Sequence, residues 1–225
     1  MPGFFVTGTD TGVGKTLVAC ALARGLRGRG LDVGVMKPVE TGVGPDGPRD
    51  AQALRAAAGC GDALGEICPL ALPLAAAPSV AAEGAGVGIA LPWLRDRFEV
   101  LAARHRWMIV EGAGGLLVPL SSEATMADLA LTLRLSLVVV ARARLGTINH
   151  TRLTLEAATR RALPLAGVVV SHAEGPLSPA DSANLAALRG WLGERLVGEL
   201  PPIAEGSPTP LDALDLDALM KGPAS

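Results

Sequence analysis

Lys15 and Thr16 follow a glycine-rich stretch that begins at Gly8 and reads Gly-Thr-Asp-Thr-Gly-Val-Gly before the lysine. The backbone N–H groups of such a loop can point at phosphate oxygens, a lysine can reach the outer phosphates, and a threonine hydroxyl can bind Mg²⁺. Thr9 stands where the strict motif has glycine. The alternative is a chance glycine-rich turn before a helix. The stretch predicts a nucleoside triphosphate site, with contacts from Gly12, Val13, Gly14, Lys15, Thr16 and Leu17.

Two carboxylates are candidates to bind Mg²⁺ together with the Thr16 hydroxyl, because this cation prefers oxygen ligands. Glu111 follows the apolar run 107–110 and precedes a glycine-rich stretch that lets the backbone pass close to a ligand. Asp50 begins the short helix expected over 50–58. An ordinary carboxylate at a sheet edge is the alternative for Glu111. For Asp50 the alternative is a helix N-cap, which spacing alone slightly favours.

Lys37 would place a second lysine beside the same site. It ends the apolar run 33–36 and precedes Pro38, which fixes the exit of the chain. Two lysines and Mg²⁺ around one site suit phosphoryl transfer to an oxyanion, where catalysis is mainly positioning and charge neutralisation. Lys15 and Lys37 are therefore the candidate catalytic residues. An exposed surface lysine is the alternative for Lys37.

A second helix start, at residues 145–149, could bind a carboxylate through free N–H groups and the helix dipole. An ordinary capped helix explains the same residues equally well. His150 is expected to be structural, and Arg142 and Arg144 to lie on solvated surface or at the rim of a cleft. The candidate binding residues here are Leu145, Gly146, Thr147 and Asn149.

Strand and helix patterns alternate along the chain, which predicts an α/β fold. It would have a doubly wound, mostly parallel sheet with helices on both faces, of the P-loop NTPase type. Ligands of such sheets bind at the carboxyl ends of the strands, where the candidate residues fall. Residues 40–49 are expected to form a loop and residues 69–92 an irregular packed connection. We expect strands over 4–7, 33–36, 107–110, 135–141, 165–170 and 196–200, and helices over 14–29, 50–58, 91–106, 148–162 and 179–195.

The bulk composition excludes several classes of protein. The 225 residues suit one domain spanning 1–225, and the net charge of −2 argues against a nucleic-acid partner. No apolar run is long enough for a membrane span, and no targeting signal is evident. The three cysteines, Cys20, Cys60 and Cys68, lack metal-ligand spacing. We expect reduced thiols in a cytoplasmic protein.

Taken together, four stretches make the chain similar to the dethiobiotin synthetase family over about residues 3–200. They are residues 8–16, Lys37-Pro38-Val39 with Thr41-Gly42, Glu111 to Gly115, and Leu145 to His150. The resemblance implies an ATP-dependent ligase of biotin biosynthesis, which joins CO₂ or bicarbonate to 7,8-diaminopelargonate (7,8-diaminononanoate). The carbamate formed would be phosphorylated to a mixed anhydride and closed to a cyclic urea.

The resemblance also implies roles for individual residues. Thr16, Asp50 and Glu111 match the family's Mg²⁺ ligands, and Thr11, Lys37 and Thr41 would bind the diamine or its carbamate. The helix start at 145–149 would come from the second subunit of a homodimer and hold the substrate carboxylate. The nucleotide would further contact Gly112, Ala113, Gly114, Ser171, Pro201, Pro202 and Ile203.

Base recognition departs from the family pattern. Ser171-His172 stands where the family often carries Asn-Asp, and a serine hydroxyl offers fewer hydrogen-bonding groups than an asparagine amide. We therefore predict weak discrimination among nucleotides, with ATP as co-substrate and other triphosphates accepted.

The main rival interpretation is a nucleotide-switch ATPase of the partitioning or septum-positioning type, which shares this fold. Those proteins carry an additional lysine early in the loop, where this chain has Thr9 or Asp10.

Overall fold

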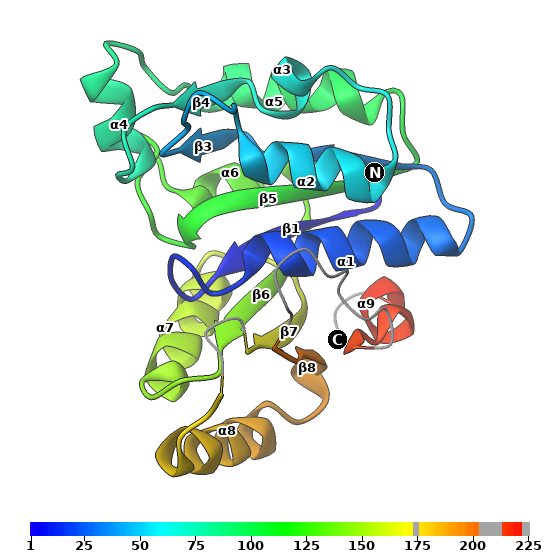
Figure 1. The fold of residues 1–225 in the computed structure, drawn as a ribbon, viewed down its shortest axis with the longest axis vertical. Helices are drawn as coiled ribbons and strands as arrows, with labels where there is room; N and C mark the ends of the chain where they lie inside the picture. Colours follow the sequence, from blue (N-terminus) through cyan, green and yellow to red (C-terminus); the bar gives the residue numbers. More distant parts are fainter. Residues whose placement is uncertain (173–175, 203–212, 222–225) are drawn as a thin grey trace.

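Six parallel strands form the central sheet in a computed structural model of the chain, which describes residues 1–172, 176–202 and 213–221 (Figure 1). Their spatial order is β2-β5-β1-β6-β7-β8, and every neighbouring pair is parallel. This confirms the predicted doubly wound sheet. The strands are β1 (Gly3–Gly8), β2 (Val33–Met36), β5 (Trp107–Gly115), β6 (Ser136–Arg142), β7 (Leu165–Ser171) and β8 (Leu196–Leu200).

Helices cover both faces of the sheet, each over its own apolar cluster (Figure 1). Phe4 and Val6 of β1 enter one cluster and Phe5 enters the other, because successive strand side chains point to opposite faces. Over the Phe4 face lie α1 (Lys15–Gly28), α2 (Arg49–Ala58), α3 (Leu64–Ile67) and α9 (Leu216–Lys221). Over the Phe5 face lie α4 (Pro78–Gly84), α5 (Leu91–Ala102), α6 (Met126–Leu133), α7 (Thr147–Arg160) and α8 (Pro179–Leu192).

The structure corrects three of the expected segments. The strand expected over 107–110 continues to Gly115 as β5. The expected loop over 40–49 begins inside strand β3 (Val39–Thr41), which pairs in parallel with β4 (Leu70–Leu72). The expected irregular connection over 69–92 therefore contains β4, and also helix α4. Strands of three residues have too short a pattern to be recognised locally, and they form here because the partner segment lies alongside.

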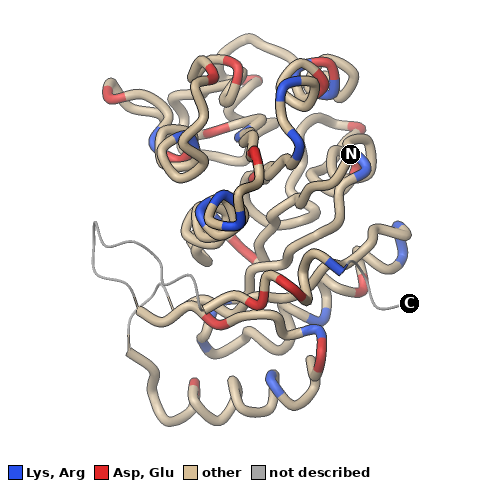
Figure 2. The backbone as a smooth tube through the Cα atoms, turned by 90° about the vertical axis from the view of Figure 1, so that its right-hand side faces the viewer, with Lys and Arg blue, Asp and Glu red and all other residues tan. Residues whose placement is uncertain are grey.

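Charged residues of both signs occur along the described chain, in the upper and the lower parts of the view in Figure 2. Within the described residues, no helix has the length and hydropathy needed to cross a bilayer. The thiols of Cys20, Cys60 and Cys68 are free.

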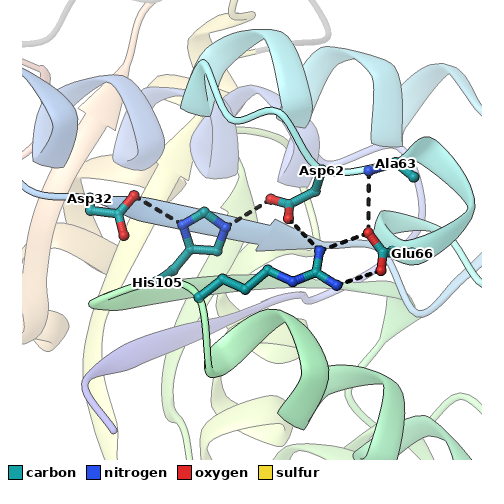
Figure 3. Close-up of polar contacts among 6 residues, drawn as sticks. Asp32, Asp62, Ala63, Glu66 and His105 are labelled. Carbon is teal, nitrogen blue, oxygen red and sulfur yellow. Dashed lines mark hydrogen bonds and ion pairs between the residues drawn. The ribbon is translucent and has the colours of Figure 1, made fainter.

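A polar network joins the segments that precede β2 and β5, at the sheet edge opposite the strand carboxyl ends (Figure 3). The His105 ring lies between two carboxylates, with Nδ1 3.0 Å from Asp32 Oδ1 and Nε2 2.8 Å from Asp62 Oδ2. Arg104 donates to Asp62 and, through two nitrogens, to Glu66. These contacts tie the amino ends of two neighbouring strands to the α2–α3 loop.

Candidate active site

The candidate site lies at the carboxyl ends of β1, β2 and β5. From β1 the chain winds to β2 and β5 on one side and then to β6, β7 and β8 on the other, and such changes of direction are where α/β sheets bind ligands. A cleft of about 410 Å³ opens there. It is lined by Thr11, Gly12, Gly14, Lys15, Thr16, Leu17, Lys37, Glu40, Thr41, Asp50, Glu111, Ala113 and Gly114.

The loop between β1 and α1 presents a helix N-terminus to this cleft. Gly14 has φ +93°, a left-handed conformation that favours glycine, and α1 begins at the next residue. The first turn of α1 has no acidic residue and no side-chain cap, so its N–H groups can serve an anion. The Lys15 ammonium donates to the Asp10 carbonyl oxygen at 3.0 Å. Burial, together with the charge of Lys37, lowers the pKa of Lys15 to about 8.

Lys37 forms the centre of the ionic contacts in the cleft. Its Nζ atom lies 2.5 Å from Glu111 Oε1, 2.8 Å from Asp50 Oδ2 and 3.4 Å from the Gly112 carbonyl oxygen. Lys37 and Glu111 are almost wholly buried, while Asp50 is partly exposed at the mouth. The structure therefore brings together three candidate residues from three different elements, as the sequence predicts.

Burial and pairing act in opposite directions on these groups. Burial alone would lower the pKa of Lys37, but the charges of Glu111 and Asp50 outweigh it and raise this pKa above its usual value. For Asp50, burial is outweighed by the Lys37 ammonium, which lowers the pKa of that carboxyl. Lys37 is therefore an ammonium and Asp50 a carboxylate at neutral pH.

The oxygen atoms around Lys37 fit a hard divalent cation. The Thr16 hydroxyl donates to Glu111 Oε1 at 2.9 Å, and Lys37 joins Glu111 to Asp50, so the three predicted metal ligands belong to one network of contacts. Glu111 Oε2 is buried and has no hydrogen-bond partner among the described residues. Within the same residues, no group of three His, Cys, Asp or Glu side chains could hold a metal. Besides the two carboxylates, a cation here would therefore need the Thr16 hydroxyl and oxygen atoms of a bound ligand.

Glu40 is a residue of this cleft that sequence reasoning missed. Its buried carboxylate accepts hydrogen bonds from the backbone N–H groups of Asp50 (3.0 Å) and Ala51 (3.1 Å). It thereby caps α2 from a neighbouring strand and fixes the turn that carries Asp50. A charged residue directly after the Lys37-Pro38-Val39 run is the signal that could have drawn attention to it.

Thr11 lines two further hollows in addition to the cleft. One, of about 410 Å³, lies between Thr11 and Thr41 and is lined by the small residues 75–78 and by Ala113, Gly114 and Val118. The other, of about 390 Å³, lies between the 9–11 loop, residues 115–119 and four residues of α7 that include His150 and Leu153. Thr11 and Thr41 thus line the same two hollows, the cleft and the hollow between them.

The second predicted helix start lies away from the cleft of its own chain. None of residues 145–149 lines the three hollows described above. Leu145 is 67% exposed, and its N–H donates to Asp181 Oδ1 at 2.7 Å. Gly146 has φ +90° and is followed by α7, whose first residue Thr147 is buried. These residues therefore do not meet Lys37 or Thr11 within one chain.

The remaining nucleotide candidates are spread along the same sheet edge. Gly12, Leu17, Ala113 and Gly114 line the cleft, Gly112 contacts Lys37, and the Val13 side chain is buried in the core. Ser171 ends β7, two strands from β1, and its buried hydroxyl has no partner in the described part of the chain. Pro201 and Pro202 are exposed after β8, and Ile203 lies outside the described residues.

Comparisons of the sequence with curated proteins reveal strong similarity to enzymes of one kind. The chain is 50% identical over 191 residues to the ATP-dependent dethiobiotin synthetase BioD of Anaeromyxobacter dehalogenans, covering 84% of this chain and 86% of the relative. It is 41% identical over 225 residues to the protein of that name from Pseudomonas paraeruginosa, covering 97% and 98%. Residues 2–209 also match the family described as an AAA domain.

Solved structures give a more distant likeness. A ParA family ATPase from Chlorobium tepidum aligns with a TM-score of 0.54 at 15% identity, covering 98% of this chain and 90% of that one. A MinC:MinD cell division complex from Aquifex aeolicus also aligns with a TM-score of 0.54, at 12% identity, covering 99% and 87%. At such low identity the likeness shows the fold alone, which agrees with the predicted sheet.

Proposed function

This chain belongs to the family of ATP-dependent dethiobiotin synthetases, and we propose that the cleft beside Lys37 is the site where the cyclic urea is closed. The observation that carries the proposal is the set of contacts made by Lys37 and Lys15. Both ammonium groups are buried in the cleft that the N-terminus of α1 also lines, and the first N–H groups of α1 can bind an anion there. Such a site suits the transfer of a phosphoryl group between two anionic molecules.

The proposed reaction has three bond-forming steps. One amine of 7,8-diaminopelargonate attacks CO₂ and loses a proton, which forms a carbamate. A carbamate oxygen then takes the γ-phosphoryl group of ATP, and ADP leaves as the P–O bond to it breaks. The second amine attacks the carbamoyl carbon, and inorganic phosphate leaves as the C–O bond of the mixed anhydride breaks. Loss of the amine proton completes the cyclic urea.

The residues of the cleft divide this work by position. The first N–H groups of α1 and the Lys15 ammonium bind the outer phosphates of the nucleotide. Lys37 stabilises the negative charge that is shared between the carbamate and the transferring phosphoryl group. Thr11 and Thr41, which line one hollow, hold the reacting end of the diamine. Positioning two anions against each other is the main contribution of such a site.

Thr16, Asp50 and Glu111 would hold Mg²⁺. Their hydroxyl and carboxylate oxygens are the ligands that this cation prefers, and Glu111 Oε2 is buried without a hydrogen-bond partner among the described residues. When bound, the cation neutralises negative charge on the β- and γ-phosphates.

A second subunit would complete the substrate site. Leu117 (50% exposed) and Leu153 (55%) line the hollow beside α7, and Leu145 (67%) is exposed in the loop that precedes α7. Association of two chains would cover these leucines and bring the partner's 145–149 helix start toward the diamine.

We expect Leu153→Asp to convert a dimer into a monomer in sedimentation, whereas Leu131→Asp, on exposed α6 surface, leaves the dimer intact. A wild-type monomer would contradict this assignment.

The decisive experiment measures phosphate release from Mg·ATP in the presence of bicarbonate, with and without 7,8-diaminopelargonate. We expect release that depends on the diamine and a product with the mass of the cyclic urea. Phosphate release independent of the diamine, or no release, would contradict the proposed use of the cleft.

A further inference from the structure

We propose that Lys37 is the resident counter-cation of Asp50 and Glu111, and that a divalent cation must displace its ammonium group. The cation would therefore enter the cleft together with a nucleotide and not alone. The proposal rests on the Mg²⁺–nucleotide site of the proposed function. It goes beyond that function because it assigns Lys37 two successive sets of partners.

The contacts of Lys37 already use the full capacity of its ammonium group. An ammonium has three N–H donors, and three acceptors surround Nζ: Glu111 Oε1, Asp50 Oδ2 and the Gly112 carbonyl oxygen. The side chain is only 4% exposed, so water cannot replace a lost partner freely. Lys37 thus occupies the position between the two carboxylates that a shared cation would take.

The Glu111 oxygen that contacts Lys37 is also the one that accepts from Thr16. A cation bound by Thr16, Asp50 and Glu111 would therefore meet the Lys37 ammonium at close range. Two positive centres in a buried site repel strongly, because little water is present to screen them. Binding of the metal and retention of both Lys37 ion pairs are therefore mutually exclusive.

A free divalent cation has little to gain from this site. The Lys37 charge partly neutralises Asp50 and Glu111, and the Glu40 carboxylate is engaged by two backbone N–H groups. A nucleotide changes this balance, because it brings negative phosphate oxygens that can accept the displaced ammonium. The lysine would then face the reacting oxyanions, where the proposed function needs it.

Lys15 offers a matched control for this proposal. It lines the same cleft and carries the same charge, but its Nζ atom contacts the Asp10 carbonyl oxygen and no carboxylate among the described residues. Replacing Lys15 removes one positive charge without freeing either metal ligand. Replacing Lys37 removes one positive charge and frees both. A comparison of the two variants separates direct occupation from general electrostatics.

The first test measures Mn²⁺ binding to the full chain by electron paramagnetic resonance at pH 8, without nucleotide. We expect Lys37→Met to bind Mn²⁺ about tenfold more tightly than the wild type, because it frees Asp50 and Glu111 from the ammonium that both contact. Lys15→Met should bind within about threefold of the wild type, because only a longer-range repulsion is removed. Equal affinities for the wild type and Lys37→Met, or an equal gain in both variants, would overturn the proposal.

The second test uses the unaltered chain, in case Lys37→Met fails to fold. The sequence contains three lysines, Lys15, Lys37 and Lys221, so side-chain ¹⁵N resonances of lysine can be assigned individually. Addition of Mg²⁺ alone should leave the Lys37 ammonium resonance unchanged, and addition of Mg²⁺ with ADP should shift it. A shift with Mg²⁺ alone, or none with Mg²⁺ and ADP, would overturn the proposal. Diamine-dependent phosphate release, measured on the same preparation, shows separately whether the proposed function holds.

Discussion

Asp32 and His105 meet at 3.0 Å just before β2 and β5, while Lys37 follows the other end of β2 and Glu111 lies further along β5. The strands pair in parallel from Val33 with Trp107 to Met36 with Val110. One strand pair is therefore joined by an ion pair at each end. The Lys37–Glu111 pair belongs to the candidate active site. The Asp32–His105 pair, here called the outer ion pair, lies at the opposite edge of the sheet and is shown in Figure 3.

The outer ion pair predicts a pH-dependent stability. Each ring nitrogen of His105 contacts a carboxylate, and only the protonated ring can donate from both. Burial would lower the pKa of His105, but Asp32 and Asp62 outweigh this effect and raise the pKa above its ordinary value. Arg104 and Glu66 are the other charged residues of the network. The stabilisation is therefore full at a pH below the ordinary histidine pKa and is lost as the pH rises through the raised value.

Denaturant unfolding of the wild type and of His105→Gln, at pH 6 and at pH 9, tests this dependence. We expect the variant to lose about 1–3 kcal/mol of unfolding free energy at pH 6 and markedly less at pH 9. His150→Gln, which removes a histidine outside this network, should leave the difference between the two pH values as in the wild type. An equal loss for His105→Gln at both values would show that the ring acts through packing alone.

Lys37→Gln should abolish turnover and leave nucleotide binding nearly intact. In the proposed mechanism the ammonium is needed where charge develops during phosphoryl transfer, whereas the α1 N-terminus and Lys15 would supply the phosphate contacts. We expect phosphate release to fall by about a hundredfold or more, with nucleotide affinity within a few-fold of the wild type. Lys221→Gln, at an exposed lysine of α9, is the control. Turnover of Lys37→Gln at the wild-type rate would remove Lys37 from the mechanism.

Glu40→Gln should act on the metal through Asp50. An amide keeps one acceptor oxygen, so one of the two N–H groups at the start of α2 would lose its charged partner. We expect the Mg²⁺ concentration for half-maximal turnover to rise several-fold, with turnover at saturating Mg²⁺ little changed. Glu83→Gln, on exposed surface of α4, controls for the loss of one charge. An unchanged Mg²⁺ requirement, or a fall in turnover at saturating Mg²⁺, would contradict a positioning role for Glu40.

The meeting of Lys37, Asp50 and Glu111 could be predicted in part from the sequence. Lys37 and Glu111 follow apolar strands, and the carboxyl ends of parallel strands share one edge of a sheet. Asp50 could not be placed with the same assurance, because it lies on a helix whose position depends on distant segments. Its N-terminal turn is held by Glu40 of β3, and β3 forms through pairing with β4 about thirty residues later.

The length of β5 illustrates a second limit. The sequence predicts that this strand ends at Val110, because the glycine-rich stretch that follows has low β-propensity. In the structure β5 continues to Gly115, where it pairs with Gly8 of β1. Glu111 therefore lies within a strand and not after one. Neighbouring strands overrode local propensity, and the same glycines let the backbone pass close to the candidate nucleotide loop.

Ser171 leads to a prediction about base selectivity. Its buried hydroxyl, at the carboxyl end of β7, has no partner among the described residues, and it would face the base with one donor where an amide offers two. We predict that ATP, CTP and GTP support turnover within about tenfold of one another, since lost base contacts remove discrimination while phosphate contacts persist. Competition between ATP and CTP or GTP measures this, and Ser171→Asn should strengthen the preference for ATP. A strong ATP preference of the wild type would show that the adenine is read by other groups.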